Sequence, residues 1–222
     1  MVMKIKINKV DKELIIKIIM KLKKLYRIKK LTKDRYKHII NMYMYARKLL
    51  FKNNNVINNK LLSEKEKAKI LISILYHDIG YTKVNKNIKI NKIIENNIHQ
   101  INSYKEAIKD NFIEDKDILE AILNHTGAKN EIYLLSQKYN DFTIYNKYYS
   151  ENKNRRKLEK NKIYKYLTYF DLHINSKGEI VTLKERLNEI KERYDKKTTV
   201  YKNIKMLEKY FEKIVKEIKL KK

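Results

Sequence analysis

The sequence contains no cysteine and no proline, and only three of its 222 residues are glycine. Without cysteine there is no disulfide framework, no thiolate metal site and no cysteine nucleophile, so any metal ion must be held by His, Asp or Glu. Without proline, and with little glycine, a chain rich in Leu, Ile, Lys, Glu and Tyr lacks the strongest helix breakers. We therefore predict an all-α chain that is long enough for one domain with a single core.

Long apolar runs are also missing. The longest, residues 70–76 and 14–20, are shorter than the roughly 20 residues of a membrane-spanning helix, and Lys17 interrupts the second. The first ten residues alternate Lys with Ile and Val, and they lack the apolar stretch and small residues of a secretory signal. We expect a cytoplasmic protein that has no membrane partner.

Acidic residues are few: the sequence has 26 Asp and Glu and 53 Lys and Arg, which gives a formal net charge of +27. A positive field of this size permits binding to the phosphates of RNA or DNA. The charge is spread along the whole chain, however, and only seven of the 53 basic residues are Arg, the type that makes bidentate contacts with phosphates and bases. A nucleic-acid-binding or regulatory protein with a structural metal site is an alternative that the sequence does not favour.

Apolar residues recur every three to four positions over several segments, which is typical of amphipathic helices. Thr32 can cap one helix, and capping boxes are expected for Ser63 with Glu66 and for Thr182 with Glu185. The predicted helices cover residues 11–26, 32–52, 63–78, 89–109, 115–125, 129–139, 157–172, 182–194 and 199–220, with a loop or frayed helix at 140–153 and a turn at 176–178.

The chain divides into a main domain at residues 31–195, an N-terminal packing helix at 1–30 and a C-terminal amphipathic helix at 196–222. The last helix carries an apolar stripe, which permits packing on the domain or on a partner such as a second copy in a homodimer. Packing within the chain is the default expectation. The stripe consists of Ile204, Leu207, Phe211 and Val215.

Four of the five histidines and two aspartates lie in or beside apolar helical segments, where ionisable side chains are rarely buried without a partner. His77 and Asp78 are adjacent at a helix end, and we expect Gly80 to let the chain turn away so that both face a cavity. Imidazole and carboxylate together suit Zn, Fe, Mn or Co rather than Ca. The candidate metal ligands are His38, His77, Asp78, His99, His125 and Asp171.

The order of these residues, and the sequence around them, resembles the HD-domain metal-dependent phosphohydrolase superfamily. The resemblance rests on several motifs in the right order rather than on one His-Asp pair. The matching segments are LISILYHDIGY at 71–81, Ile98-His99 before an Ala-containing helix, AILNHTGA at 121–128, YLTYFD at 166–171 and, shared with a branch of uncharacterised bacterial HD proteins, residues 175–194.

This resemblance covers residues 30–195 and implies an all-α, single-domain helical bundle of the HD type with a C-terminal helical extension. Members with the short motif set hold one divalent ion, and members with two extra histidines hold a second ion that the motif aspartate, here Asp78, bridges to the first. Because His99 and His125 are both present, the resemblance implies one or two ions of Fe, Mn, Co or Zn. The implied ligands of the first ion are His38, His77, Asp78 and Asp171.

The reaction that the resemblance implies is hydrolysis of a phosphate ester or anhydride by a metal-bound hydroxide, with His77 and Asp78 in catalytic roles. The expected substrate is a phosphorylated small molecule, most readily a nucleotide-like one. Within the same class, Asn124-His125-Thr126 resembles the bacterial diadenosine tetraphosphate hydrolases, so cleavage of dinucleoside polyphosphates is an alternative.

One departure from the family lies directly after the His-Asp-Ile-Gly motif, where many relatives have Lys and this chain has Tyr81. Lys83 or one of three arginines is a candidate to contact the substrate phosphate instead, and an ordinary solvated or ion-paired side chain is the alternative for each arginine. His173, two residues past Asp171, falls outside the family pattern and is not assigned as a ligand. The candidate substrate-binding residues are Tyr81, Lys83, Arg155, Arg156 and Arg186.

Overall fold

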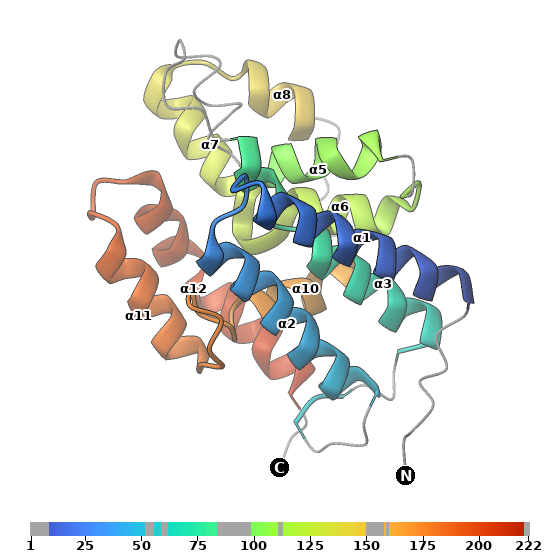
Figure 1. Ribbon diagram of the computed structural model, residues 1–222. Coiled ribbons are helices and arrows are strands. Elements are labelled where there is room, and N and C mark those ends of the chain that lie inside the picture. The colour runs from blue at the N-terminus through green and yellow to red at the C-terminus, as the bar shows by residue number, and fades with distance from the viewer. Residues whose placement is uncertain are drawn as a thin grey trace.

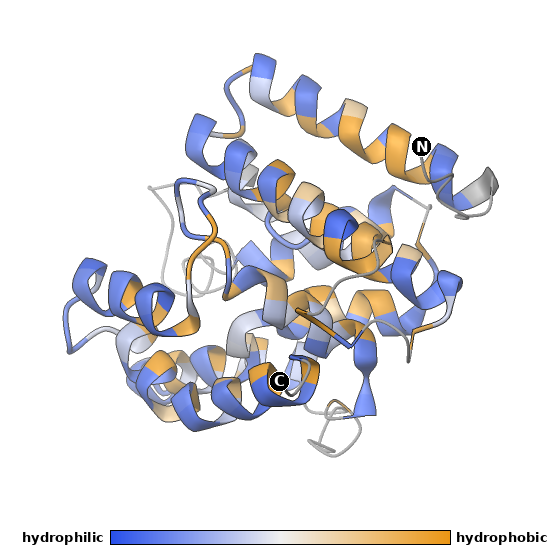
Figure 2. Cartoon of the chain, turned by 90° about the horizontal axis from the view of Figure 1, so that it is seen from below, coloured by the Kyte–Doolittle hydropathy of each residue, from blue (hydrophilic) through white to orange (hydrophobic). Residues whose placement is uncertain are grey.

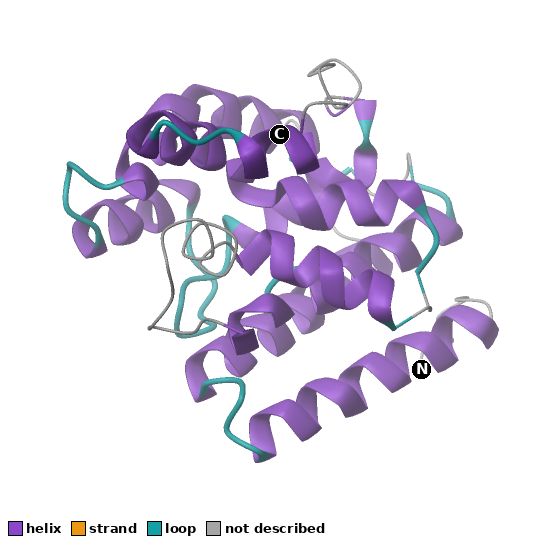
Figure 3. Ribbon diagram, turned by 90° about the horizontal axis from the view of Figure 1, so that it is seen from above, coloured by secondary structure: helices purple, strands orange, loops and turns teal. Residues whose placement is uncertain are grey.

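Helix α3 (Glu64–Tyr76) lies at the centre of an all-α fold and packs against helices from both halves of the chain (Figure 1). The computed structural model describes residues 9–51, 56–58, 62–83, 99–110, 113–149, 158 and 160–219, and it contains no strand within them (Figure 3). The other elements are α1 (Lys9–Arg27), α2 (Lys33–Phe51), η2 (Ile79–Lys83), α5 (His99–Lys109), α6 (Lys116–Asn124), η3 (His125–Gly127), α7 (Ala128–Tyr139), α8 (Thr143–Tyr149), α10 (Lys162–Asp171), α11 (Leu183–Arg193) and α12 (Thr199–Ile218).

The first two helices cover one side of α3, as their apolar spacing predicts. In α1, Ile18 and Leu22 are buried while Ile16 and Met20 are exposed, and Figure 2 shows the apolar face of this helix turned toward the rest of the chain. The Thr32 hydroxyl accepts a hydrogen bond from the Arg35 amide at 3.3 Å, which confirms the predicted start of α2. No helix in the described residues is both long and apolar enough to cross a bilayer.

Helix α3 delivers the His-Asp pair. Ser63 and Glu66 form the predicted capping box at its start, and every residue from Ile70 to Tyr76 is buried. The sequence predicts that Gly80 lets the chain turn away after the His-Asp pair. Helix α3 already ends at Tyr76, and Gly80 lies within η2 without a positive φ, so the turn does not use the conformational freedom of glycine. A Cβ on Gly80 would lie 2.1 Å from the His99 carbonyl oxygen, so glycine is needed here to let α5 approach.

The middle of the chain is more helical than its composition indicates. Asp115 caps α6, and the predicted break at Gly127 separates α6 from α7. The segment at 140–153 was expected to be a loop or a frayed helix, yet α8 forms within it because Ile144 and Tyr149 are buried in a small cluster with Leu123 of α6. Residues 150–157 lie outside the described part of the chain.

The C-terminal helices close the side of the bundle next to α10. The capping box of Thr182 and Glu185 is confirmed, and Asn161 rather than the region of Lys157 starts α10. Helices α11 and α12 pack against each other, and α12 also packs against α7 and α10. The apolar stripe of α12 is buried within the chain, with Phe211 fully inaccessible.

Candidate metal centre

Five separate helices bring the six predicted ligands to one place. His38 lies within α2, His77 and Asp78 follow α3, His99 begins α5, His125 follows α6 and Asp171 ends α10. Their ligand atoms form three overlapping groups in which all atoms lie within 4.8 Å of one another. The groups are His38 with His77 and Asp78, His77 with His125 and Asp171, and Asp78 with His99 and His125.

Backbone carbonyls fix the orientation of three of the imidazole rings. Nδ1 of His38 lies 2.9 Å from the Asn175 carbonyl oxygen, and Nδ1 of His77 and of His125 lies 2.7 Å from the carbonyl oxygen three residues earlier in each case. A carbonyl oxygen only accepts hydrogen bonds, so Nδ1 carries the hydrogen and Nε2 of the neutral ring presents a lone pair. This is the arrangement in which proteins hold a metal-binding histidine.

The lone pairs point at carboxylate oxygens. Nε2 of His38 lies 3.2 Å from Asp171 Oδ1, and Nε2 of His77 lies 3.3 Å from Asp78 Oδ2. Neither Nε2 makes a hydrogen bond within the described residues, although both rings are fully buried. A buried lone pair that faces a carboxylate needs a cation between them, either a proton or a metal ion, so these residues fit a divalent ion.

The two oxygens of Asp78 face different histidines. Oδ2 lies toward His38 and His77, while Oδ1 lies 3.2 Å from Nε2 of His99 and 3.8 Å from Nε2 of His125. Nε2 of His99 and Nε2 of His125 are themselves 3.3 Å apart. Asp78 therefore stands between two pairs of imidazole nitrogens, which is the geometry of a carboxylate that can serve two ions.

Burial and charge act against each other throughout this cluster. Burial alone would raise the pKa of Asp78, but the Arg35 guanidinium and His77 hold that pKa well below its ordinary range. The pKa of Asp171 is lowered in the same way by His38, His77 and Arg186 against the effect of burial. Both carboxylates are therefore ionised at neutral pH, as ligands must be.

The pKa values of His77 and His99 are shifted in opposite directions. Burial would lower the pKa of His77, yet the adjacent Asp78 carboxylate outweighs burial and raises it. Burial prevails at His99, where it lowers the pKa to about 4 against the attraction of Asp78. His99 is thus neutral and available as a ligand across the physiological range.

Thr126 positions the last aspartate. Its hydroxyl donates a hydrogen bond of 2.5 Å to Asp171 Oδ2. The residue has φ 52° and ψ 27°, a left-handed conformation that is rare for a β-branched side chain and that occurs mostly where surrounding structure enforces it. The strained turn therefore aims the hydroxyl at the cluster.

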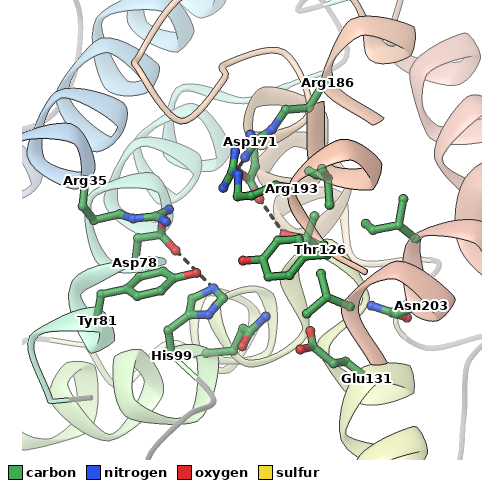
Figure 4. A pocket seen from close by; sticks show the side chains of 15 residues that line it. Arg35, Asp78, Tyr81, His99, Thr126, Glu131, Asp171, Arg186, Arg193 and Asn203 are labelled. Atoms are coloured by element: carbon green, nitrogen blue, oxygen red, sulfur yellow. Dashed lines mark hydrogen bonds and ion pairs between the residues drawn. The ribbon is translucent and has the colours of Figure 1, made fainter. Parts of the chain in front are cut away.

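An open pocket of about 560 Å³ leads to the cluster, and Figure 4 shows its side chains. We call one side the inner wall, which consists of Arg35, Asp78, Tyr81, His99, Thr126 and Asp171. We call the other side the outer wall, which consists of Arg186, Ile190, Arg193, Tyr194, Asn203 and Ile204 from α11, the turn after it and α12.

Aromatic stacking organises the inner wall. The Tyr81 ring stacks on His99 at 4.1 Å between centroids, and the Arg35 guanidinium carbon lies 3.9 Å from the centre of the same ring. Arg35 also forms an ion pair with Asp78. Arg35 therefore places a cation beside the residue that replaces the Lys of many relatives.

The predicted substrate-binding residues have different outcomes. Tyr81 and Arg186 line the pocket. Arg155, Arg156 and the side chain of Lys83 lie outside the described part of the structure.

Sequence reasoning missed several pocket residues. Arg35 could have been found, because it precedes His38 by three positions and so shares its face of α2. Glu131, whose pKa burial raises to about 7, gave no signal in the sequence. Arg193 lies in the matching segment 175–194 but was given no role, and Asn203 gave no signal, because their place in the pocket depends on how α11 and α12 pack.

His173 is not part of the centre. It is buried, its Nδ1 donates to the Tyr169 carbonyl oxygen at 2.7 Å, and its ring stacks on Tyr169 at 4.2 Å. Burial lowers its pKa to about 4. It belongs to none of the three ligand groups found in the described residues, so it is a hydrogen-bonded core histidine.

Comparison with known proteins identifies the family. The model of the HD domain matches residues 35–169, which is more than half of the chain and includes every predicted ligand except Asp171. No curated protein matches the chain, and no solved structure does. The helical fold, the His-Asp pair at the end of α3 and this match agree, and the chain belongs to the HD-domain family.

Proposed function

We propose that this chain is a metal-dependent phosphohydrolase that cleaves a phosphate ester or anhydride in a nucleotide-like small molecule. The observation that carries the proposal is the position of Asp78, whose two carboxylate oxygens each face a different pair of histidine Nε2 atoms. Asp171 supports one side of this arrangement from α10. His77 and Asp78 are the residues to which we assign the central catalytic roles.

Divalent ions bound by such residues polarise phosphoryl oxygens and lower the pKa of a coordinated water, which supplies the nucleophile for in-line displacement. The chain contributes the positioning. Carbonyl hydrogen bonds hold three of the imidazole rings in one tautomer, and Thr126 holds Asp171. Arg35 lies at the same mouth of the pocket and can neutralise charge that develops on the phosphoryl group.

The nucleotide-like part of the proposal rests on the pocket lining. Tyr194 lines the pocket with an aromatic ring, beside three guanidinium groups, whereas the two faces of the Tyr81 ring are already covered by His99 and by Arg35. Aromatic rings can stack on a nucleobase, and guanidinium groups can hold phosphate oxygens. A simple phosphomonoester would make use of only the metal centre, so the lining favours a larger substrate.

The test is product analysis, by phosphate release and by chromatography of the nucleotides formed, on a panel of nucleotides, sugar phosphates and diadenosine tetraphosphate, with Mn²⁺, Co²⁺, Fe²⁺, Zn²⁺ or Mg²⁺ added to metal-free protein. The proposal expects metal-dependent release from at least one nucleotide, abolished in His77→Ala and unchanged in Arg27→Gln, an exposed substitution at the end of α1. Symmetric cleavage of diadenosine tetraphosphate would support that alternative substrate. No hydrolysis of any substrate with any metal would contradict the proposal.

A further inference from the structure

Arg186 is a buried cation with unused hydrogen-bond donors. It is 7% exposed, and its Nη1 donates to Glu189 Oε2 at 2.6 Å. Its Nε has no hydrogen-bond partner among the described residues, although the atom is inaccessible to solvent. A guanidinium carries five N–H donors, and Arg186 also lines the pocket, so donors other than the enclosed Nε can bind an oxyanion there.

Arg193 lies on the same face of α11, two turns further on. It pairs with Oε1 of Glu189, while Arg186 pairs with Oε2, so one carboxylate holds both guanidinium groups. Ser176 fixes this carboxylate in turn, because its hydroxyl donates to Glu189 Oε1 at 2.6 Å. The two cations are therefore held in place before any ligand arrives.

The choice of arginine is informative in this chain. Only seven of the 53 basic residues are Arg, yet three of the seven line the pocket. Among the described residues that line it there is no Lys. Lys is the usual basic residue of this chain, but the basic residues of the pocket are Arg. The planar guanidinium group of Arg can bind two oxygens of a phosphate at once.

The arginines also lie next to the metal centre. Arg186 Nη2 is 3.9 Å from Asp171 Oδ1, one of the candidate ligands. Figure 4 shows Arg186 and Arg193 beside Asp171, on the opposite side of the pocket from Glu131. An anion held by these arginines would therefore lie next to Asp171.

We propose that Arg186 and Arg193 form a second anion subsite on the outer wall, so that the preferred substrate carries two linked phosphates, as a nucleoside diphosphate or triphosphate does. This inference rests on the proposed function for the identity of the reaction. The binding of the second phosphate does not depend on turnover. The subsite takes the phosphate next to the scissile one and sets its distance from the centre.

The test is calorimetric binding of two non-hydrolysable probes, methylenediphosphonate and methylphosphonate, to metal-free and to Mn²⁺-loaded protein. Wild-type protein should bind the diphosphonate at least about tenfold more tightly than the monophosphonate. Arg193→Gln, at a side chain that is 38% exposed, should lose most of that ratio while methylphosphonate binding is unchanged. Arg27→Gln removes the same charge at an exposed site outside the pocket and should leave the ratio intact.

Arg186→Gln leaves Glu189 with one fewer partner and can fail to fold, so Arg186→Lys is the second variant. It keeps the charge and removes the planar fork, and the ratio should fall several-fold. An unchanged ratio in Arg193→Gln and in folded Arg186→Lys would overturn the subsite. Intact diphosphonate selectivity without phosphate release from any nucleotide would overturn the proposed function and leave the subsite standing.

Discussion

The two walls of the pocket are built in different ways. Behind the inner wall, the rings of His38, His77 and His125 are held by backbone carbonyls and are fully buried, so the fold itself sets their position. On the outer wall, Arg186 and Arg193 are held by another side chain, Glu189, and Arg193 is partly exposed. Backbone contacts keep the metal-ligand side chains in one position. The positions of the two arginines depend on a single side chain, Glu189, so a few substitutions can change them. We infer that the inner wall carries the reaction and the outer wall the choice of substrate.

Substitution of Asp78 should have the largest effect on the metal centre, because both of its carboxylate oxygens face histidine nitrogens. We expect Asp78→Ala to lower phosphate release by at least about a thousandfold, with loss of bound metal. Helicity measured by circular dichroism should remain close to that of the wild type. The exposed Asp34→Ala in α2 is the control, and wild-type turnover in Asp78→Ala would contradict the role of the carboxylate.

Gly80 tests whether the inner wall depends on the close approach of α5. A Cβ would meet backbone atoms at 2.1 and 2.5 Å, so Gly80→Ala must push α5 and His99 away. We expect a loss of about 3 kcal/mol in the free energy of unfolding together with weaker metal binding.

Gly178 provides the comparison for that variant. Gly178→Ala, at φ 83° in the turn whose Asn175 carbonyl holds His38, should cost about 1–2 kcal/mol and weaken metal binding less than Gly80→Ala does. Chemical denaturation and metal titration of both variants would measure the difference. Equal effects on metal binding would show that the approach of α5 does not shape the site.

Thr126 tests whether a residue that holds a ligand, without being a ligand itself, contributes to metal affinity. Thr126→Val removes the hydroxyl that donates to Asp171 and should weaken metal affinity about 10- to 100-fold. Thr126→Ser keeps the hydroxyl and should bind metal almost as the wild type does. Metal affinities are measured by competition with a chromophoric chelator. Equal affinities for the two variants would show that the Thr126 hydroxyl does not support metal binding.

Glu131 should produce the smallest effect, on stability rather than on chemistry. Burial raises its pKa from 4.5 to about 7, so the folded state holds a proton that the unfolded state has released between those pH values. This contribution to stability is complete below pH 4.5 and is lost as the pH rises through 7. Relative to the wild type, Glu131→Gln should therefore gain about 1–2 kcal/mol of stability between pH 5 and 8.

Urea unfolding of both proteins at pH 5, 6, 7 and 8 isolates this residue, because Asp78 and Asp171 contribute equally to the two curves. A constant difference between wild type and Glu131→Gln across the range would show that Glu131 is not protonated in the folded protein.

The sequence predicted the fold well where local signals are strong. The capping boxes at Ser63 and Thr182 mark helix starts through side-chain hydrogen bonds that the residues themselves determine. It failed at α8, whose polar and aromatic composition hides the two residues that pack against α6. It also misjudged Gly80, because the need for glycine comes from a helix 20 residues away along the chain.

The candidate site divides in the same way. The six ligands were named from motifs, and the structure brings all six together, although their role as ligands stays a prediction. On the outer wall only Arg186 was named as a candidate, although Arg193 and Tyr194 also lie in the matching segment 175–194. Arg193 and Asn203 reach the pocket only because α11 and α12 fold back over it, a tertiary contact that periodicity does not encode.

The central claim is that Asp78 and the histidines around it hold divalent metal. The most direct measurement is the metal content of wild-type and Asp78→Ala protein, determined by elemental analysis after loading with Mn²⁺ and removal of free ions. We expect about two ions per wild-type chain and fewer than one in the variant, in keeping with a carboxylate that faces two pairs of histidines. No ion retained by the wild-type protein, or equal retention by both proteins, would contradict the account.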